Sequence, residues 1–230
     1  MINLALIGKA IQHSKSQSMY EDLLSTKVNY DLLDYFTEDE IPSLEFLFSK
    51  YEGISITSPY KEFFLDKVNL SSDVKRVKAI NCLTKTQKGY YGYNTDLLAL
   101  EEIINNFLQK YKTIGFYILG DGVMGRVVSF ICEKQSIPYQ ILSRKKCENF
   151  SNLTLLNKIN SEKKTIVINC CSRNYIFNGD IDNNFIFWDL NYSFKPHDDL
   201  FLSNGCEYID GLELLNLQAK HAIEIWGVQK

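Results

Sequence analysis

The sequence contains no apolar stretch that approaches the ~18 residues of a membrane-spanning helix. It also has no run of basic residues long enough to neutralise many phosphates, and its formal net charge is −3 at pH 7. We therefore expect neither a membrane partner nor a nucleic-acid partner. The N-terminus lacks the basic region and the small-residue cleavage site of a signal peptide, so we expect a cytoplasmic protein.

Cysteine spacings typical of metal or redox sites are lacking as well. The six cysteines include an adjacent pair but no Cys-x-x-Cys, and no histidine stands at metal-ligand spacing beside them. We expect reduced, mostly buried thiols and no metal site. The apolar fraction of 45% is ordinary for a soluble globular protein, so 230 residues can bury the core of one large domain or two small ones.

Apolar periodicity alternates along the chain between short strand-like runs and longer helix-like runs. This alternation predicts an α/β protein of two lobes, with parallel strands joined by crossover helices. Along the first part of the chain we expect strands at 4–7, 30–36, 53–57 and 79–83, helices at 18–26, 40–49 and 61–68, and a turn-rich stretch at 88–92. A helix at 97–111 is expected to bridge the two lobes. After it we expect strands at 114–119, 139–142, 165–170, 185–190 and 208–209, helices at 123–133 and 153–159, and a closing helix at 212–226. The segment Asn94-Thr95-Asp96 is predicted to cap the helix at 97–111.

A glycine-rich turn, Gly120-x-Gly122-x-x-Gly125, follows the predicted strand at 114–119 and opens the helix after it. In this setting the first glycine makes the turn, the second lets the backbone approach a pyrophosphate, and the third allows close contact between helix and strand. The helix N-terminus adds N–H donors for the phosphates. The sequence therefore favours dinucleotide binding over the alternative, an ordinary structural turn.

The end of the next strand bears on which dinucleotide is bound. A carboxylate there would hold the ribose 2′-hydroxyl of NAD, but the strand ends in Ser143-Arg144-Lys145-Lys146. A guanidinium at Arg144 can pair bidentately with a 2′-phosphate, which favours NADP. The alternative is a solvated basic turn, and Asp121 within the glycine turn counts slightly against a phosphate site.

Five motifs, in order along nearly the whole chain, resemble those of shikimate dehydrogenases. They are Gly8-Lys9-Ala10-Ile11-Gln12-His13-Ser14-Lys15-Ser16, Gly53-Ile54-Ser55-Ile56-Thr57-Ser58-Pro59-Tyr60-Lys61-Glu62, Ala79-Ile80-Asn81-Cys82-Leu83, Gly92-Tyr93-Asn94-Thr95-Asp96 and Leu214-Leu215-Asn216-Leu217-Gln218-Ala219. The resemblance implies a substrate-binding catalytic domain at 1–97 and 212–230, with the last helix returning to it. It also implies a Rossmann-like NADP-binding domain at 98–211.

The activity implied by the resemblance is reversible NADPH-dependent reduction of 3-dehydroshikimate to shikimate, in the chorismate route to aromatic amino acids. The substrate is then a small molecule, and the protein a monomer or homodimer. Two alternatives stay open, a paralogue that acts on quinate or aminoshikimate and a degenerate, noncatalytic NADP-binding homologue.

The resemblance assigns catalysis to Lys61 and Asp96. A ketone that accepts hydride needs a proton at its oxygen, which Lys61 can deliver while Asp96 holds and orients it. The alternative for Lys61 is an ordinary surface lysine at the start of a helix, without a catalytic role. The substrate-binding residues implied are Ser14, Ser16, Thr57, Asn81, Asp96, Gln218 and Tyr192, and the cofactor-binding residues are Gly120, Gly122, Val123, Met124, Gly125, Ser143, Arg144, Lys145 and Gly211.

The two serines can donate hydrogen bonds to a substrate carboxylate, whereas Thr57, Asn81 and Gln218 suit a polyhydroxylated ring. For Tyr192, packing in the apolar core is an alternative of equal weight to substrate binding. His13 is expected to tie down its loop.

Four departures from the motifs leave the choice of substrate open. Ser55 stands in place of an asparagine and Gln17 in place of a proline, while Leu97 and Glu213 stand in place of glycine or a small residue. At Ser55 one hydrogen bond to a ring hydroxyl is either lost or carried by water.

Overall fold

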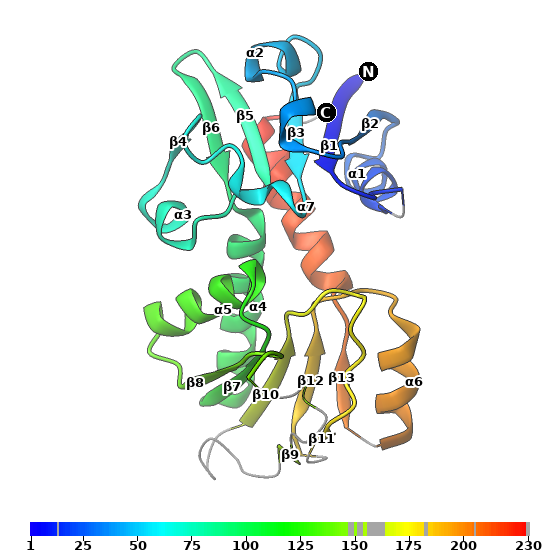
Figure 1. The fold of residues 1–230 in the computed structure, drawn as a ribbon, viewed down its shortest axis with the longest axis vertical. Coiled ribbons are helices and arrows are strands. Elements are labelled where there is room, and N and C mark those ends of the chain that lie inside the picture. The colour runs from blue at the N-terminus through cyan, green and yellow to red at the C-terminus, as the bar shows by residue number, and fades with distance from the viewer. Residues whose placement is uncertain are drawn as a thin grey trace. The chain divides into compact units, whose positions relative to one another are not determined.

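The computed structural model describes residues 1–12, 14–146, 150, 154–155, 164–181, 184–204 and 206–228. The chain divides into two compact units, Met1–Ala99 with Asn216–Lys230, and Leu100–Leu215 (Figure 1). The sequence-based boundaries, after residues 97 and 211, lie within about one helical turn of these. Two helices, α4 (Thr95–Tyr111) and α7 (Leu212–Trp226), contribute residues to both units.

The first unit contains a mixed six-stranded sheet in the order β2-β1-β3-β5-β6-β4. Its strands are β1 (Ile2–Gly8), β2 (Val28–Asp34), β3 (Gly53–Ile56), β4 (Asn69–Leu70), β5 (Cys82–Thr86) and β6 (Gly89–Tyr93). Strand β1 is parallel to β2 and β3, as predicted, but β5 is antiparallel to both β3 and β6. The prediction of a turn-rich stretch at 88–92 is wrong. A short turn before Gly89 reverses the chain, and the tyrosines that follow it suit a strand.

The helices of the first unit are α1 (Ser16–Leu24), α2 (Leu44–Leu47), α3 (Ser72–Val77) and the 3-10 helices η1 (Glu38–Glu40) and η2 (Tyr60–Glu62). The helix predicted at 40–49 is shorter, since Pro42 interrupts it and Ser43 caps α2 by accepting a hydrogen bond from the Phe46 N–H. The prediction of a helix at 61–68 is wrong for the residues after η2, which form turns. Helix α3 was not predicted; the Ser71 side chain caps it.

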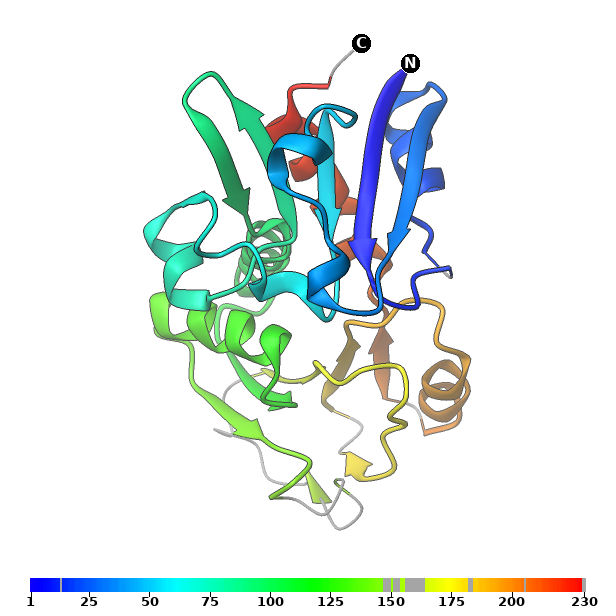
Figure 2. The same ribbon diagram turned by 45° about the horizontal axis from the view of Figure 1, so that its top comes forward.

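The two faces of this sheet bury separate apolar clusters, as the alternation of side chains along β1 requires. Leu4 and Leu6 face a cluster that includes α1 and α7, whereas Ala5 and Ile7 face α2 and η2. Figure 2 shows α1 and α7 on the same side of the sheet.

The second unit contains a parallel sheet in the order β13-β12-β10-β7-β8. Its strands are β7 (Ile114–Leu119), β8 (Tyr139–Leu142), β10 (Lys164–Asn169), β12 (Ile186–Asp189) and β13 (Glu207–Ile209). The strand order reverses between β7 and β10, and ligands of such sheets bind at the carboxyl ends of the strands at this point. The α/β prediction is confirmed.

Two helices of the second unit are α5 (Val123–Lys134) and α6 (Lys195–Asn204), and a small parallel pair consists of β9 (Thr154–Leu155) and β11 (Asp180–Ile181). Helix α6 was not predicted. The helix expected at 153–159 lies outside the described residues except at β9, where the prediction is wrong.

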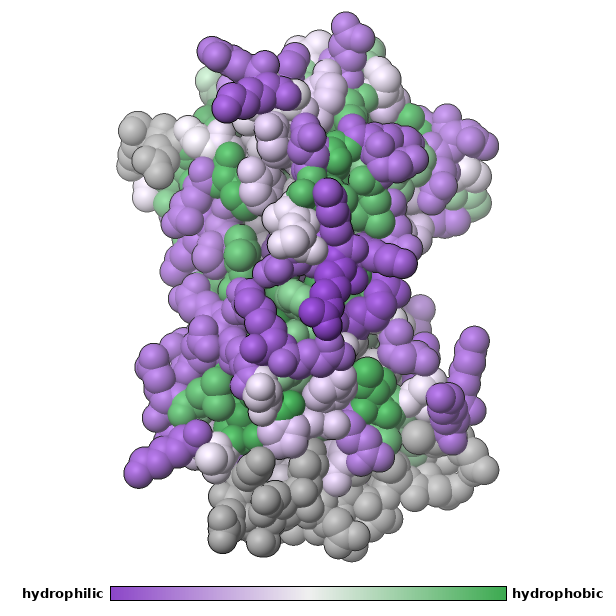
Figure 3. All heavy atoms as spheres, turned by 90° about the vertical axis from the view of Figure 1, so that its left-hand side faces the viewer, coloured by the Kyte–Doolittle hydropathy of each residue, from purple (hydrophilic) through white to green (hydrophobic). Residues whose placement is uncertain are grey.

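The face drawn in Figure 3 is mostly hydrophilic, with hydrophobic residues in small separate groups. Within the part of the chain that the structure describes, no helix is long and apolar enough to cross a bilayer.

Trp226 anchors the end of α7 to the sheet of the first unit. Its indole N–H donates to the Leu83 carbonyl oxygen at 2.9 Å, and a side chain at Gly53 would overlap its ring. We expect Trp226→Ala to lower the free energy of unfolding by about 3–5 kcal/mol, because a large buried ring is deleted. Trp226→Phe keeps most of the apolar contact and should lose about 1–2 kcal/mol. Urea denaturation measures both, and a wild-type midpoint for the alanine variant would contradict this anchoring.

Candidate active site

The loop after β1 brings two predicted serines together. Gly8 ends β1 without a side chain, and a Cβ there would overlap the side chains of Ile11 and Thr57. The loop closes when the Ser14 N–H donates to the Ile11 carbonyl oxygen at 2.9 Å. The Ser14 hydroxyl then donates to the Ser16 hydroxyl at 3.1 Å, and both side chains are half-buried. His13 lies outside the described residues.

Lys61 and Asp96 form an ion pair in the first unit. The lysine Nζ lies 2.6 Å from Oδ2 of the aspartate, and the side chains are only 15% and 9% exposed. Lys61 is in η2, and Asp96 is in the first turn of α4. Asn94, the first residue of the predicted cap segment, caps this helix by accepting a hydrogen bond from the Leu97 N–H at 2.8 Å. Two segments far apart in sequence are thus fixed around one charge pair.

Asn81 connects the start of α4 to α7. Its amide nitrogen donates to Oε1 of Gln218 at 3.2 Å, and its amide oxygen accepts hydrogen bonds from the N–H and hydroxyl of Thr95. The Asn81 carbonyl oxygen accepts from Ile56 N–H at the end of β3, next to Thr57. Because Thr95 immediately precedes Asp96, this network of amide hydrogen bonds reaches the residue next to the ion pair.

The predicted residues of the first unit collect at one edge of its sheet. Strands β1, β3 and β6 run in one direction and end there, while β5 runs in the opposite direction and begins there. Ser14 and Ser16 follow β1, Thr57 follows β3, Asn81 precedes β5, Asp96 follows β6, and Gln218 is bonded to Asn81. The arrangement combines hydroxyl, amide and charged groups, which can bind a small polar molecule and move a proton.

In the second unit the three glycines of the turn lie in three different surroundings. Gly120 has φ +102°, a conformation that favours glycine. A Cβ at Gly125 would overlap the carbonyl oxygen of Gly120, so a side chain there would push α5 away from β7. A Cβ at Gly122, the N-cap of α5, would meet nothing within 4 Å. The exposed Asp121 lies between them.

Arg144 lies in a basic turn next to the glycine turn. The Gly120 N–H donates to the Leu142 carbonyl oxygen at 2.8 Å, and the turn after β8 closes as the Lys146 N–H donates to the Ser143 carbonyl oxygen. The guanidinium carbon of Arg144 lies 5.4 Å from the centre of the Tyr175 ring, a cation–π contact. Ser143 is buried, Lys145 is exposed, and Val123 and Met124 are half-buried in α5.

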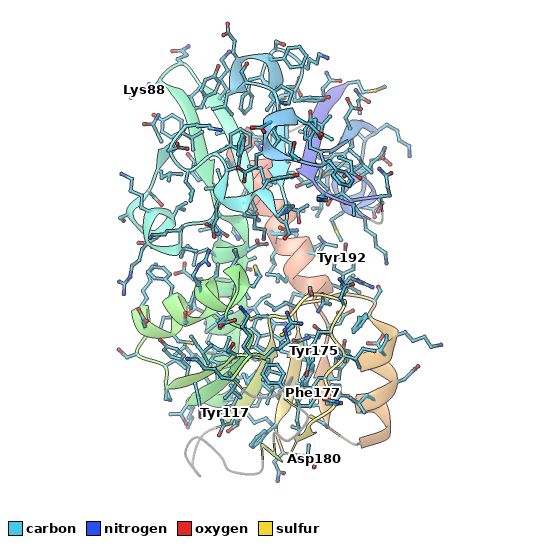
Figure 4. The ribbon with its side chains drawn as sticks, in the orientation of Figure 1. Lys88, Tyr117, Tyr175, Phe177, Asp180 and Tyr192 are labelled. Carbon is cyan, nitrogen blue, oxygen red and sulfur yellow. The ribbon has the colours of Figure 1, made fainter. Side chains whose placement is uncertain are left out.

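Tyr175 and Cys171 come from the segment that follows β10, where sequence patterns gave no signal. Figure 4 labels Tyr175 near Phe177, and both belong to one buried apolar cluster. Burial raises the pKa of the Cys171 thiol to about 11, and the Arg144 guanidinium opposes part of that rise. Cys171 is therefore a neutral thiol near neutral pH, and it lies against the place where a Gly120 side chain would be. None of the five cysteines described takes part in a disulfide.

Tyr192 and Gly211 lie in loops of the second unit, whereas the other predicted substrate residues belong to the first. Arg173 donates to the carbonyl oxygens of Tyr192, at 2.8 Å, and Ser193, and its guanidinium lies over the Tyr192 ring. The Gly211 N–H donates to the Asn191 carbonyl oxygen. Tyr192 is half-buried, so it is not a fully buried core residue.

Sequence patterns did not indicate the buried polar network beside these loops. Asp189 and His197 form a fully buried pair, with the histidine Nδ1 2.5 Å from Oδ2 of the aspartate. The other carboxylate oxygen accepts from the amide groups of Asn169 and Asn191. The network ties the end of β12 to β10 and α6.

The four departures from the motifs have different surroundings. Gln17 and Glu213 are exposed, and Leu97 is buried in the core. Ser55 is half-buried, and its hydroxyl is hydrogen-bonded to the Tyr20 hydroxyl at 3.1 Å. Tyr20 is one helical turn after Ser16, a spacing that could have indicated it from the sequence.

Residues 6–83 match the family model of the shikimate dehydrogenase substrate binding domain. The chain is 27% identical to the shikimate dehydrogenase (NADP(+)) of Saccharolobus solfataricus, with 96% of this chain and 87% of that protein covered. It is 28% identical to the shikimate dehydrogenase (NADP(+)) of Methanococcus aeolicus, with 97% and 91% covered.

Solved structures show the same fold. The chorismate mutase/shikimate 5-dehydrogenase fusion protein from Clostridium acetobutylicum superposes with a TM-score of 0.72 at 21% identity, over 100% of this chain and 93% of that one. Shikimate 5-dehydrogenase from Thermus thermophilus, in complex with NADP(H) and shikimate, gives 0.72 at 18% identity, over 100% and 95%.

Fold and geometry thus define a two-unit α/β protein with a glycine turn where the order of a parallel sheet reverses. Over nearly its whole length the chain is similar to proteins named shikimate dehydrogenase, in sequence and in fold.

The contrast between two glycines of the turn is testable by stability. We expect Gly125→Ala to lower the free energy of unfolding by about 1–3 kcal/mol, because its methyl group overlaps the Gly120 carbonyl oxygen. Gly122→Ala should change it by less than about 0.5 kcal/mol, since φ is −77° and the space is open. Chemical denaturation measures both variants, and equal losses would refute the assignment of close helix-strand contact to Gly125.

Proposed function

We propose that the protein is an NADP-dependent shikimate dehydrogenase that reversibly reduces 3-dehydroshikimate to shikimate with NADPH, in the chorismate route to aromatic amino acids. The observation that carries the proposal is the nearly buried Lys61–Asp96 ion pair, at the sheet edge that also holds the predicted hydroxyl and amide ligands. The names of the relatives support the substrate and the cofactor. In this proposal the first unit binds the substrate and the second binds NADP.

The chain's own contribution to the chemistry is proton transfer. The Lys61 ammonium group donates a proton to the ketone oxygen as negative charge develops on it, and the resulting amine takes the proton back in the reverse direction. Asp96 accepts a hydrogen bond from Lys61 at 2.6 Å and so fixes the direction of the ammonium group. Asn81 and Gln218 present amide groups to ring hydroxyls, and the Ser14–Ser16 hydroxyl pair binds the carboxylate through the Ser16 proton.

The second unit fits a dinucleotide. NADP(H), when bound, supplies or accepts the hydride. The open space at Gly122 leaves room for a pyrophosphate at the N-terminus of α5, where backbone N–H groups are available. Arg144 would hold the 2′-phosphate, flanked by Ser143 and Lys145, because a guanidinium pairs with phosphate bidentately.

The first test is a spectrophotometric assay of purified protein with shikimate and NADP, and with quinate or NAD in separate reactions. We expect NADPH formation with shikimate, and an enzyme inactive on every cyclohexene and cyclohexane acid tested would refute the proposed activity. Lys61→Ala should lower kcat by about 10²–10⁴-fold, the usual contribution of a general acid, and keep its affinity for shikimate. Lys50→Ala, an exposed lysine of the same unit, is the matched control. Unchanged turnover in the Lys61 variant would remove this residue from the mechanism.

The second test concerns the choice of cofactor. Arg144→Ala should weaken NADP binding by about 10–100-fold, because charge-assisted hydrogen bonds to the 2′-phosphate are lost, and should leave NAD binding nearly unchanged. Calorimetry on the two dinucleotides measures the difference directly. Lys134→Ala, which removes another surface cation of the second unit, serves as the control. Equal losses for NADP and NAD would argue against a 2′-phosphate contact at Arg144.

A further inference from the structure

On three elements of the first unit, the residues on the same face as a predicted substrate residue form a row of side chains that leads into the core. Tyr20 follows Ser16 by one helical turn on α1, and Ser55 on β3 lies two positions before Thr57, the residue that follows this strand. Residues at these spacings share one face of a helix or one face of a strand. On α7, Trp226 follows Gln218 at the spacing of two helical turns. Each row therefore begins with a predicted ligand and leads into the cluster between sheet and helices.

The three rows meet at Tyr20. Its hydroxyl lies 3.1 Å from the hydroxyl of Ser55, and its ring centre lies 5.3 Å from that of Trp226. Tyr20 is only 4% exposed, whereas Ser55 is half-buried. Of the two hydroxyls, that of Ser55 is the one a ligand at this edge can reach. Tyr20 supports it from inside the core.

The direction of this hydrogen bond follows from the chemistry of the two groups. Burial raises the pKa of the Tyr20 phenol well above its usual value, Tyr30 acts in the same direction, and the hydrogen bond with Ser55 opposes part of the rise. The phenol is therefore protonated at neutral pH, and a phenolic O–H is a stronger donor than an alcohol. When Tyr20 donates to Ser55, the proton of Ser55 is left for another acceptor. A donated hydrogen bond also polarises the serine and strengthens its own donation.

Ser14 and Ser16 form a second hydroxyl pair of the same kind at the start of α1. The Ser14 hydroxyl donates to that of Ser16, so the Ser16 proton is likewise left for an acceptor. Tyr20 lies on the same side of α1 as Ser16, which places the Ser55 pair at the serine side of the site. Two such donors suit the two oxygens of one carboxylate.

We infer that Tyr20 is a positioning residue for substrate recognition, since it donates to Ser55 and thereby directs the Ser55 hydroxyl to the substrate carboxylate beside Ser16. The inference rests on the proposed function, which supplies the carboxylate. It makes Tyr20 and Ser55 a single element of specificity, which acts on binding and leaves the proton transfer at Lys61 and Asp96 unchanged.

The test is a double-mutant cycle on steady-state kinetics and on shikimate binding measured by calorimetry. Ser55→Ala should raise KM and Kd for shikimate about tenfold, because a hydrogen bond to a charged group is lost. Tyr20→Phe should raise them about three- to fivefold, because Ser55 loses its orientation. The double variant should match Ser55→Ala alone, since the two residues share one effect. We expect the kcat of all three variants to stay within about twofold of the wild-type value. The lost hydrogen bond stabilises the bound substrate and the transition state equally, and contacts made only in the transition state are kept.

The methyl ester of shikimate, which lacks the anionic carboxylate, provides the specificity arm. Wild type and both single variants should bind the ester with nearly equal affinity. Tyr51→Phe is the matched control, since its phenol donates to Asp31 at 2.7 Å and it belongs to the cluster on the opposite face of the sheet. This control should bind shikimate as the wild type does. Thermal unfolding of each variant verifies that the compared proteins are folded.

Three outcomes overturn the inference. Effects of Tyr20→Phe and Ser55→Ala that multiply in the double variant would show that the two hydroxyls act separately. An unchanged KM in folded Tyr20→Phe, in a wild type that oxidises shikimate, would leave the proposed function standing and remove the role of Tyr20. A wild type inactive on shikimate would refute the proposed function, and this inference with it.

Discussion

The ion pair between Lys61 and Asp96 is the interaction on which the arrangement of the first unit depends. Two nearly buried charges are stable only when each has its partner, and removing one leaves an uncompensated charge that is strongly destabilising. The surrounding elements therefore fix both ends. Asn94 caps α4 and so sets the position of Asp96, while the Lys61 carbonyl oxygen accepts a hydrogen bond from Ile80 next to Asn81.

A steric constraint has the corresponding role in the second unit. The carbonyl oxygen of Gly120 comes so close to Gly125 that no side chain fits there, which brings the start of α5 against the end of β7. The same turn brings Gly120 beside the end of β8, and Arg144 lies in the turn that follows this strand. The proposed dinucleotide site thus rests on the strand order and on one close backbone contact, and the Tyr175 ring lies against the Arg144 guanidinium from the next strand connection.

Local sequence signals predicted the elements whose stability is decided locally. Strands β7 and β8 and helix α7 have the predicted bounds, because each is a short apolar run or a regular amphipathic helix with clear ends. The prediction failed for β6, where a short turn reverses the chain and places it antiparallel to β5. It also failed for the residues after η2, since a helical apolar period does not by itself form a helix in so short a segment.

The sequence by itself determined the types and order of the chemical groups: the serines after β1, Lys61, Asp96, Gln218, the glycine turn and Arg144. Only the tertiary structure decided which of them touch. The bond between Tyr20 and Ser55 joins residues 35 positions apart, and the contact of Arg144 with Tyr175 joins a turn to a segment beyond another strand. Such contacts depend on how strands are ordered and paired in the sheet, which no local pattern encodes because the segments meet only after the chain has folded.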